Sequence, residues 1–301
     1  MAHIATNEKD MTGFIPKKKF FVGIDSDGCV FDAMEIKHKE CFIPNTVNVW
    51  GLQSVSRYVR EVHEFVNLYS KWRGLNRWKN IVRTMDYLRE HPEVKRRGVV
   101  VPSIEGVRAF VESGTTLSDA GLYAYMKDHH EPDLETGTRW SMDVNASIEH
   151  IVHGMMPFGL VRESFRALKE EADLACVSAT RNTDLAREWT FAGILDDVEL
   201  LCGQEVGTKE QILRLTAQGK YEGDHILMMG DAPGDMKAAK SVGALFYPID
   251  PGYEQESWDR FYNEAYKKFL DGTYAGTYEE KLIERFESLL PEVPPWEKNG
   301  K

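Results

Sequence analysis

Residues 20–28 read Phe-Phe-Val-Gly-Ile-Asp-Ser-Asp-Gly, an apolar run that ends in two aspartates one residue apart and a glycine. A short apolar run without alternation is typical of a parallel strand that is covered on both faces. Residues just past the carboxyl end of such a strand lie in the crevice where open α/β sheets bind ligands. Burying Asp25 and Asp27 there without a counter-charge would be costly, so we expect a cation or another polar partner. At this point an ordinary turn that contains two aspartates is an equal alternative.

A second carboxylate pair occurs far along the chain in the same setting. The apolar run at 225–229 is followed by Asp231 and Asp235, and then by a helical pattern. Parallel strands of one sheet have their carboxyl ends at the same edge, so we expect these two aspartates to meet Asp25 and Asp27 there. Several carboxylate oxygens with room for waters suit a small hard cation such as Mg²⁺.

Two further apolar runs are followed by polar residues that we expect at the same edge of the sheet. The run at 173–177 is followed by Ser178, and the run at 198–202 leads to Thr-Lys-Glu-Gln at 208–211. The threonine and the glutamine of this sequence have the spacing of a capping box. The box places Lys209 in the first turn of a helix. Acids, a hydroxyl, a lysine and further acids thus follow four strands in order along the chain.

This order resembles the haloacid dehalogenase-like (HAD) hydrolase superfamily, and all four of its motifs are matched. Residues 25–32, Asp-Ser-Asp-Gly-Cys-Val-Phe-Asp, are similar to the first motif. Ser178 is similar to the second motif, Lys209 to the third, and residues 230–235 to the fourth. The resemblance covers residues from about 20 to 36 and from about 155 to 250. The one departure is Cys29, which stands where the family often has threonine.

The resemblance implies an α/β fold, a Rossmann-like doubly wound parallel sheet, and a phosphoryl-transfer reaction. Asp25 would be the nucleophile and would form an aspartyl-phosphate, as carboxylates can. Asp27 would be the general acid for the leaving alcohol and then the general base for water. Ser178 and Lys209 would hold the phosphoryl oxygens.

The resemblance also implies a Mg²⁺ site. In the family the metal lies between the side chain of the first aspartate, here Asp25, the backbone carbonyl of the second, here Asp27, and the fourth-motif aspartate, here Asp231. Asp235 would support the metal through a water or would orient Lys209.

Asp27 separates reaction types within the family. Family members that cleave carbon–halogen or carbon–phosphorus bonds generally lack this second acid. The presence of Asp27 therefore favours a phosphatase for a small phosphorylated metabolite. A phosphomutase or phosphotransferase stays an alternative, because the same acid could return the phosphoryl group to a sugar hydroxyl. The other alternative is a non-catalytic regulatory binding module on the same fold.

Residues 37–153 separate the first two motifs and are too many for a loop. Apolar residues recur at helical spacing at 55–69 and 78–88, with shorter patterns at 104–111 and 117–126. We therefore expect a mainly α-helical cap domain inserted into a core made of residues 15–36 and 154–301. Two later helical patterns, at 258–269 and 278–290, flank the core or form a dimer surface.

Residues 70–79 join the two main helical patterns and hold four cations and two tryptophans. Arginine forks suit the oxygens of phosphate and carboxylate groups. We expect Arg73, Asn76 and Arg77 to bind an anionic substrate. A solvated loop between helices is the alternative.

Composition excludes several other classes of protein. The chain has 301 residues, 42% of them hydrophobic, and a net charge of −11, which disfavours a nucleic-acid binder. No window approaches the ~18 apolar residues that span a bilayer, and residues 1–19 contain no signal-peptide pattern. The four cysteines show no Cys-x-x-Cys spacing, so we expect reduced thiols and a cytoplasmic protein. A homo-oligomer stays an open alternative.

Overall fold

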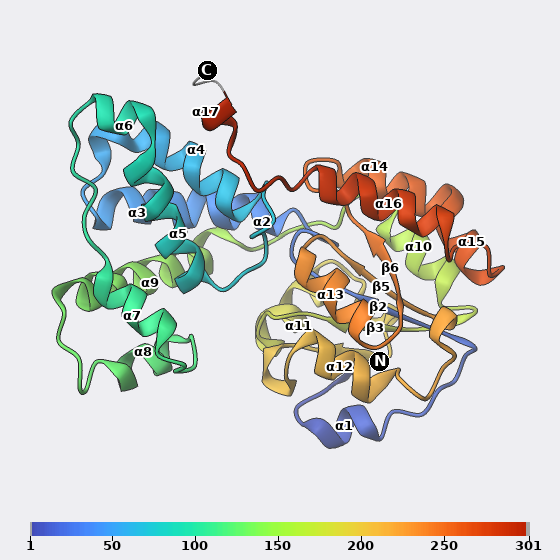
Figure 1. Ribbon diagram of the computed structural model, residues 1–301. Coiled ribbons are helices and arrows are strands. Elements are labelled where there is room, and N and C mark those ends of the chain that lie inside the picture. The colour runs from blue at the N-terminus through green and yellow to red at the C-terminus, as the bar shows by residue number, and fades with distance from the viewer. Residues whose placement is uncertain (1, 299–301) are drawn as a thin grey trace. The chain divides into compact units, whose positions relative to one another are not determined.

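The computed structural model describes residues 2–298, which divide into two compact units (Figure 1). Unit 1 comprises Met1–Met34 and Gly154–Leu289. Unit 2 comprises Glu35–His153 and Leu290–Lys301.

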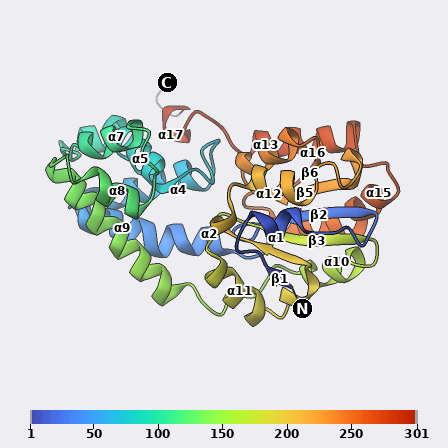
Figure 2. The same cartoon turned by 90° about the horizontal axis from the view of Figure 1, so that it is seen from below.

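Unit 1 is built on one six-stranded sheet in the order β1-β4-β3-β2-β5-β6, in which every paired strand is parallel (Figure 1 and Figure 2). From the central strand β2 the chain builds outward in one direction through β3 and β4, and in the other through β5 and β6. This confirms the doubly wound parallel sheet. The strands are β1 (His3–Ile4), β2 (Phe20–Ile24), β3 (Ala172–Val177), β4 (Leu200–Cys202), β5 (Ile226–Gly230) and β6 (Leu245–Pro248).

The register of the central strands decides which residues meet at the carboxyl edge. Ile24 lies opposite Cys176 of β3 and Met229 of β5, so these three strands end nearly in step. β2, β3 and β5 are buried along their whole length, as continuous apolar runs predict. The residues that follow them, beginning with Asp25, are therefore brought to one place.

Helices cover both faces of this sheet. On one face, Phe165, Trp189 and Trp258 share a single buried cluster with Val22 and Ile24 of β2. They come from α10 (Val161–Leu168), α11 (Asn182–Phe191) and α14 (Glu254–Arg260). α12 (Lys209–Thr216) lies on the other face, where it contacts α13 (Pro233–Ser241) and α1 (Glu8–Thr12). A Cβ on Gly23 would lie 3.0 Å from the side chain of Leu213 in α12, so this glycine lets the helix approach the sheet closely.

The C-terminal helical patterns pack on the core. Trp258, Phe261, Ala265 and Phe269 are buried in the same cluster as the sheet residues. They lie on α14, a π-helical turn at Phe261–Ala265 and α15 (Tyr266–Leu270), which are followed by α16 (Thr277–Ser288). These patterns therefore flank the sheet.

Unit 2 contains helices and no strand among its described residues, in line with the predicted helical insertion. Its buried cluster includes Val59, Trp78 and Trp140. The predicted helices are present as α4 (Ser56–Asn67), α5 (Arg77–Glu90), α7 (Glu105–Glu112) and α8 (Asp119–Tyr125). The other helical elements are a π-helical turn at Lys37–Phe42, a 3₁₀ turn at Gln53–Val55, α3 (Ile43–Val49), α6 (Pro92–Arg96), α9 (Pro132–Ile151) and α17 (Pro295–Lys298). α2 (Ala33–Ile36) spans the junction of the units.

The observed boundaries differ from the predicted ones at both ends of the chain. Residues 2–14 belong to unit 1, where Ala5 and Met11 are fully buried. Residues 290–298 belong to unit 2 and not to the core, because the ring of Trp296 packs against Phe65 and His91 at centroid distances of 5.4 and 5.2 Å. In the described part of the chain, no helix is both long and apolar enough to cross a membrane.

Candidate active site

Asp25 lies at the first position beyond β2 and is 5% exposed. Its backbone amide donates to the carbonyl of Met229 (3.0 Å), which continues the sheet ladder by one residue. The following turn closes around Ser26, whose carbonyl accepts from the amide of Val30 (2.9 Å). Gly28 has φ +79° in this turn, a conformation that favours glycine. The side-chain Oδ1 of Asp25 accepts from the amide of Ser26 (2.8 Å), which fixes the direction of the carboxylate.

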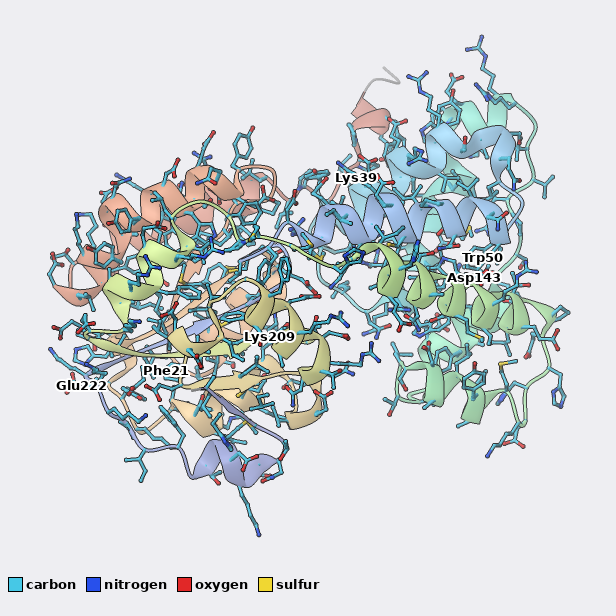
Figure 3. The ribbon with its side chains drawn as sticks, turned by 180° about the vertical axis from the view of Figure 1, so that it is seen from behind. Phe21, Lys39, Trp50, Asp143, Lys209 and Glu222 are labelled. Atoms are coloured by element: carbon cyan, nitrogen blue, oxygen red, sulfur yellow. The ribbon has the colours of Figure 1, made fainter. Side chains whose placement is uncertain are left out.

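Lys209, which Figure 3 labels, belongs to the first turn of α12. Its side chain lies between two of the predicted carboxylates. The predicted capping box of Thr208 and Gln211 is present and sets the start of the helix. The Nζ of Lys209 lies 2.7 Å from Oδ2 of Asp25 and 2.5 Å from Oδ1 of Asp235. Burial alone would lower the pKa of Lys209, but Asp235 and Asp25 outweigh it and raise that pKa, so the side chain is an ammonium ion.

Asp235 is held by a close approach of its own loop. Its Oδ2 accepts from the amide of Ala232 (3.0 Å), and its side chain is fully buried. Gly230, the last residue of β5, makes room for it, because a Cβ at Gly230 would lie 2.4 Å from Cγ of Asp235. The strand–loop–helix sequence at 230–235 thus places Asp231 and Asp235 on the same edge as Asp25.

One oxygen each of Asp25, Asp231 and Asp235 lie within 4.8 Å of one another, and all three residues are buried. Burial raises the pKa of Asp25 well above its ordinary value; Lys209 opposes this rise, and Asp235 and Asp231 add to it. Three buried carboxylates against one ammonium leave the cluster short of positive charge. A set of carboxylate oxygens with this deficit fits a hard divalent cation. The side chain of Asp27 is not part of this group.

Asp27 is held by the loop after β3. Its Oδ2 accepts from the hydroxyl of Thr180 (2.8 Å). The amide of Thr180 donates to Oγ of Ser178 (3.2 Å), and Ser178 itself is 2% exposed. Thr180 therefore links Asp27 to Ser178. None of the sequence motifs assigns a role to Thr180, and its hydroxyl two residues after Ser178 is the signal that could have identified it.

Arg73, Asn76 and Arg77 lie in unit 2, where each has a contact that helps build that unit. Nη1 of Arg73 donates to the carbonyl of Leu68 (2.9 Å), and Arg73 is 2% exposed. The side-chain oxygen of Asn76 caps α5 by accepting from the amide two residues on (2.9 Å). Nη1 of Arg77 donates to Oδ1 of Asn145 (2.7 Å). Their role in substrate binding stays a prediction.

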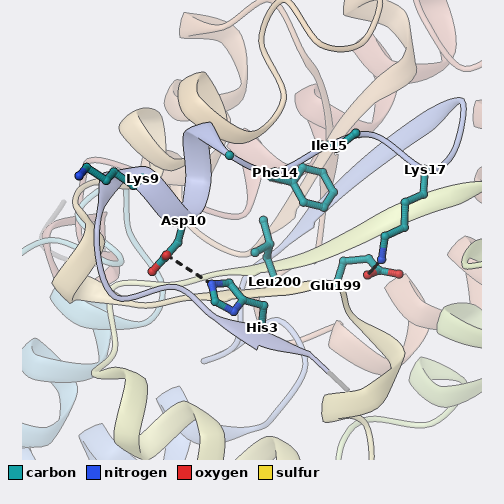
Figure 4. A pocket seen from close by; sticks show the side chains of 9 residues that line it. His3, Lys9, Asp10, Phe14, Ile15, Lys17, Glu199 and Leu200 are labelled. Carbon is teal, nitrogen blue, oxygen red and sulfur yellow. Dashed lines mark hydrogen bonds and ion pairs between the residues drawn. The ribbon is translucent and has the colours of Figure 1, made fainter.

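A separate open cavity of about 440 Å³ lies beside the edge strand β1 (Figure 4). His3, Asp10, Phe14, Lys17 and Glu199 contribute to its wall. None of the predicted site residues lines it, so it is distinct from the carboxylate cluster.

No family model and no curated protein sequence matches the chain. Among solved structures, a predicted phosphoglycolate phosphatase from Haemophilus somnus 129PT is 15% identical, with 77% of this chain and 86% of that chain covered and a TM-score of 0.47. A HAD-superfamily hydrolase, subfamily IA, variant 1, from Geobacter sulfurreducens PCA is 14% identical, with 78% of this chain and 89% of that chain covered and a TM-score of 0.39. A haloacid dehalogenase-like family protein from Streptococcus pneumoniae is also 14% identical, with 79% of this chain and 90% of that chain covered and a TM-score of 0.38. At these low identities and TM-scores, the assignment depends on the geometry of this chain itself.

Proposed function

We propose that this protein is a Mg²⁺-dependent phosphatase of the HAD type that hydrolyses a small phosphorylated metabolite. The observation that carries the proposal is the buried cluster in which Lys209 bridges Asp25 and Asp235 at 2.7 and 2.5 Å, with Asp231 beside them. These residues follow three strands of the sheet and belong to the first, third and fourth of the sequence motifs. A cluster of this kind offers a nucleophile and fixed positive charge, which phosphoryl transfer requires.

Asp25 is the nucleophile in this mechanism. Its carboxylate oxygen forms a bond to phosphorus while the bond from phosphorus to the leaving oxygen breaks. Asp27 gives a proton to that oxygen, so the product leaves as an alcohol. Asp27, now ionised, takes a proton from water as the water attacks phosphorus. The bond between phosphorus and Asp25 then breaks, and inorganic phosphate is released.

Lys209 and Ser178 hold the transferring group. The ammonium ion of Lys209 is buried and already oriented by Asp235, so little reorganisation is needed when charge develops on the phosphoryl oxygens. It also reduces the repulsion between Asp25 and a dianionic substrate. The amide of Thr180 fixes Oγ of Ser178, which leaves the hydroxyl proton of Ser178 to donate to a phosphoryl oxygen.

The carboxylates of Asp25 and Asp231 would hold the Mg²⁺ ion, together with the backbone carbonyl of Asp27. Asp235 contacts Lys209 and the amide of Ala232, so its role is to orient Lys209 and to support the metal from behind. When bound, the ion neutralises charge on the phosphoryl oxygens.

In this proposal, residues of unit 2 bind the organic part of the substrate. Arg73, Asn76 and Arg77 would favour a substrate with a second anionic group, because guanidinium forks pair with carboxylate and phosphate oxygens. The test is the KM of Arg77→Ala for the substrate that the screen below identifies. An unchanged KM would contradict this role.

The experiment that tests the function is a screen of phosphorylated metabolites with Mg²⁺, read by the release of inorganic phosphate. Asp25→Asn is the inactive variant, and Asp32→Asn is its matched control, because Asp32 lies on the same loop but is exposed. We expect activity in the wild type and in Asp32→Asn, and none in Asp25→Asn. Activity that survives in Asp25→Asn would contradict the nucleophile assignment.

A further inference from the structure

The loop that follows β3 contains a residue whose two polar groups contact two different parts of the site. We propose that Thr180 is a positioning residue for Asp27, and that its hydroxyl holds the carboxyl group in the orientation needed for proton transfer. This inference rests on the proposed function, because it concerns the acid and base of the same reaction.

The contacts of Thr180 connect Asp27 with Ser178. The hydroxyl of Thr180 donates to Oδ2 of Asp27 at 2.8 Å, across 153 positions of sequence. The backbone amide of the same residue donates to Oγ of Ser178 at 3.2 Å. One residue therefore fixes the proposed acid and a proposed phosphoryl ligand relative to each other.

The backbone of Thr180 is itself held by the segment that follows β4. Its carbonyl accepts from the amide of Gln204 at 3.0 Å. Gly203 permits this approach, since a Cβ there would lie 2.4 Å from the carbonyl oxygen of Thr180. The buried side chain of Asn182 holds Gly203 in place. It accepts a hydrogen bond from the amide of Gly203 (2.8 Å) and donates one to the carbonyl of Ala5 beside β1 (2.7 Å).

This support explains why the hydroxyl can act on the chemistry. The terminal torsion of an aspartate is broad, so a carboxyl group without such a contact samples many orientations. A rigid donor on Oδ2 fixes the plane of the group, and thereby the direction in which the other oxygen gives or takes a proton. Proton transfer by a positioned side chain contributes about 10²–10⁴-fold to rate, and this contribution depends on orientation.

The test compares Thr180→Val, which keeps the shape but removes the hydroxyl, with Thr180→Ser, which keeps the hydroxyl. The probes are phenyl phosphate and p-nitrophenyl phosphate with Mg²⁺, and kcat/KM is measured because it reports the steps up to phosphorylation of the enzyme. Phenolate is the poorer leaving group and depends more on the general acid. We expect Thr180→Val to lower kcat/KM for phenyl phosphate about 10-fold or more, because a general acid that is no longer oriented loses part of its ~10²–10⁴-fold contribution to the rate. The loss for p-nitrophenyl phosphate should be smaller, and Thr180→Ser should recover most of both.

A double-mutant cycle separates positioning from a merely structural role. With Asp27→Asn already present, adding Thr180→Val should cause no further loss if Thr180 acts through Asp27. An equal loss for both substrates, or the same loss in the Asp27→Asn background, would overturn the inference, as would wild-type activity in Thr180→Val. If Thr180→Val does not fold, Thr180→Ala serves in the same cycle. Failure of the proposed function has a different signature, because it is shown by activity in Asp25→Asn.

Discussion

Gly230→Ala tests how tightly the fourth-motif loop must close to place Asp235. A Cβ at position 230 would lie 2.4 Å from Cβ and Cγ of Asp235 and 2.5 Å from its Oδ2. Such contacts are too short to persist, so the side chain of Asp235 or the loop must move. Asp235 is fully buried, and its two oxygens are held by Lys209 and by the amide of Ala232.

The cost has two parts. Overpacking of this kind destabilises a protein by about 1–3 kcal/mol. Displacing Asp235 also weakens its contact with Lys209, and a hydrogen bond to a charged group contributes about 1.5–3 kcal/mol. We therefore expect Gly230→Ala to lose a few kcal/mol of unfolding free energy and at least 10-fold in kcat/KM.

The assay is urea unfolding together with kcat/KM for p-nitrophenyl phosphate. Gly234→Ala is the matched control, because Gly234 lies four residues further on and a Cβ there would meet no atom within 4 Å. Alanine in the first turn of α13 should leave stability unchanged or raise it by about 0.4–1 kcal/mol. If Gly230→Ala is as stable and as active as Gly234→Ala, the close approach is not a requirement and the reasoning is wrong.

Three further predictions concern buried side chains. Lys209→Met removes the ammonium ion that pairs with both Asp25 and Asp235, so we expect kcat/KM to fall at least 10-fold and the protein to lose about 3–5 kcal/mol of stability. Unchanged activity would exclude the phosphoryl-binding role. Burial lowers the pKa of His63 to about 3, whereas the unfolded chain takes up this proton below about 6.5. Stability is therefore lost as pH falls from about 6.5 toward 3, by about 2 kcal/mol at pH 5, and the loss in urea unfolding should be smaller in His63→Gln; identical pH profiles for the two proteins would contradict this. Trp296→Ala removes a buried ring from the aromatic cluster of unit 2 and should cost about 3–5 kcal/mol, and an unchanged thermal midpoint would show that this ring is not packed there.

The sequence predicts the sheet and the carboxylate cluster because both depend on short-range patterns. Continuous apolar runs mark β2, β3 and β5, and parallel pairing then brings whatever follows each run to one edge. Asp25, Asp231, Asp235 and Lys209 meet for that reason. Two-residue β1 has no pattern long enough to detect, and it forms because its backbone pairs with β4.

Other features depend on tertiary contacts that no local pattern encodes. α9 has 20 residues, and its buried positions include Gly137 and Ser141, so its apolar stripe is interrupted. Thr180 donates a hydrogen bond to a residue 153 positions away, and its own carbonyl lies close against Gly203. Trp296 follows two prolines and lies outside any helical pattern of apolar residues, yet it packs against Phe65.

The proposed mechanism requires the carboxylate at position 25 to become phosphorylated during turnover. It is tested most directly by incubating the protein with Mg²⁺ and p-nitrophenyl phosphate, quenching with acid, and locating the phosphoryl group by peptide mass spectrometry. We expect a phosphorylated Asp25 in the wild type and none in Asp25→Asn. Two results would contradict the proposed nucleophile. One is phosphate release by the wild type with the phosphoryl group on another residue. The other is phosphate release with no phosphorylated peptide under conditions that preserve an aspartyl-phosphate.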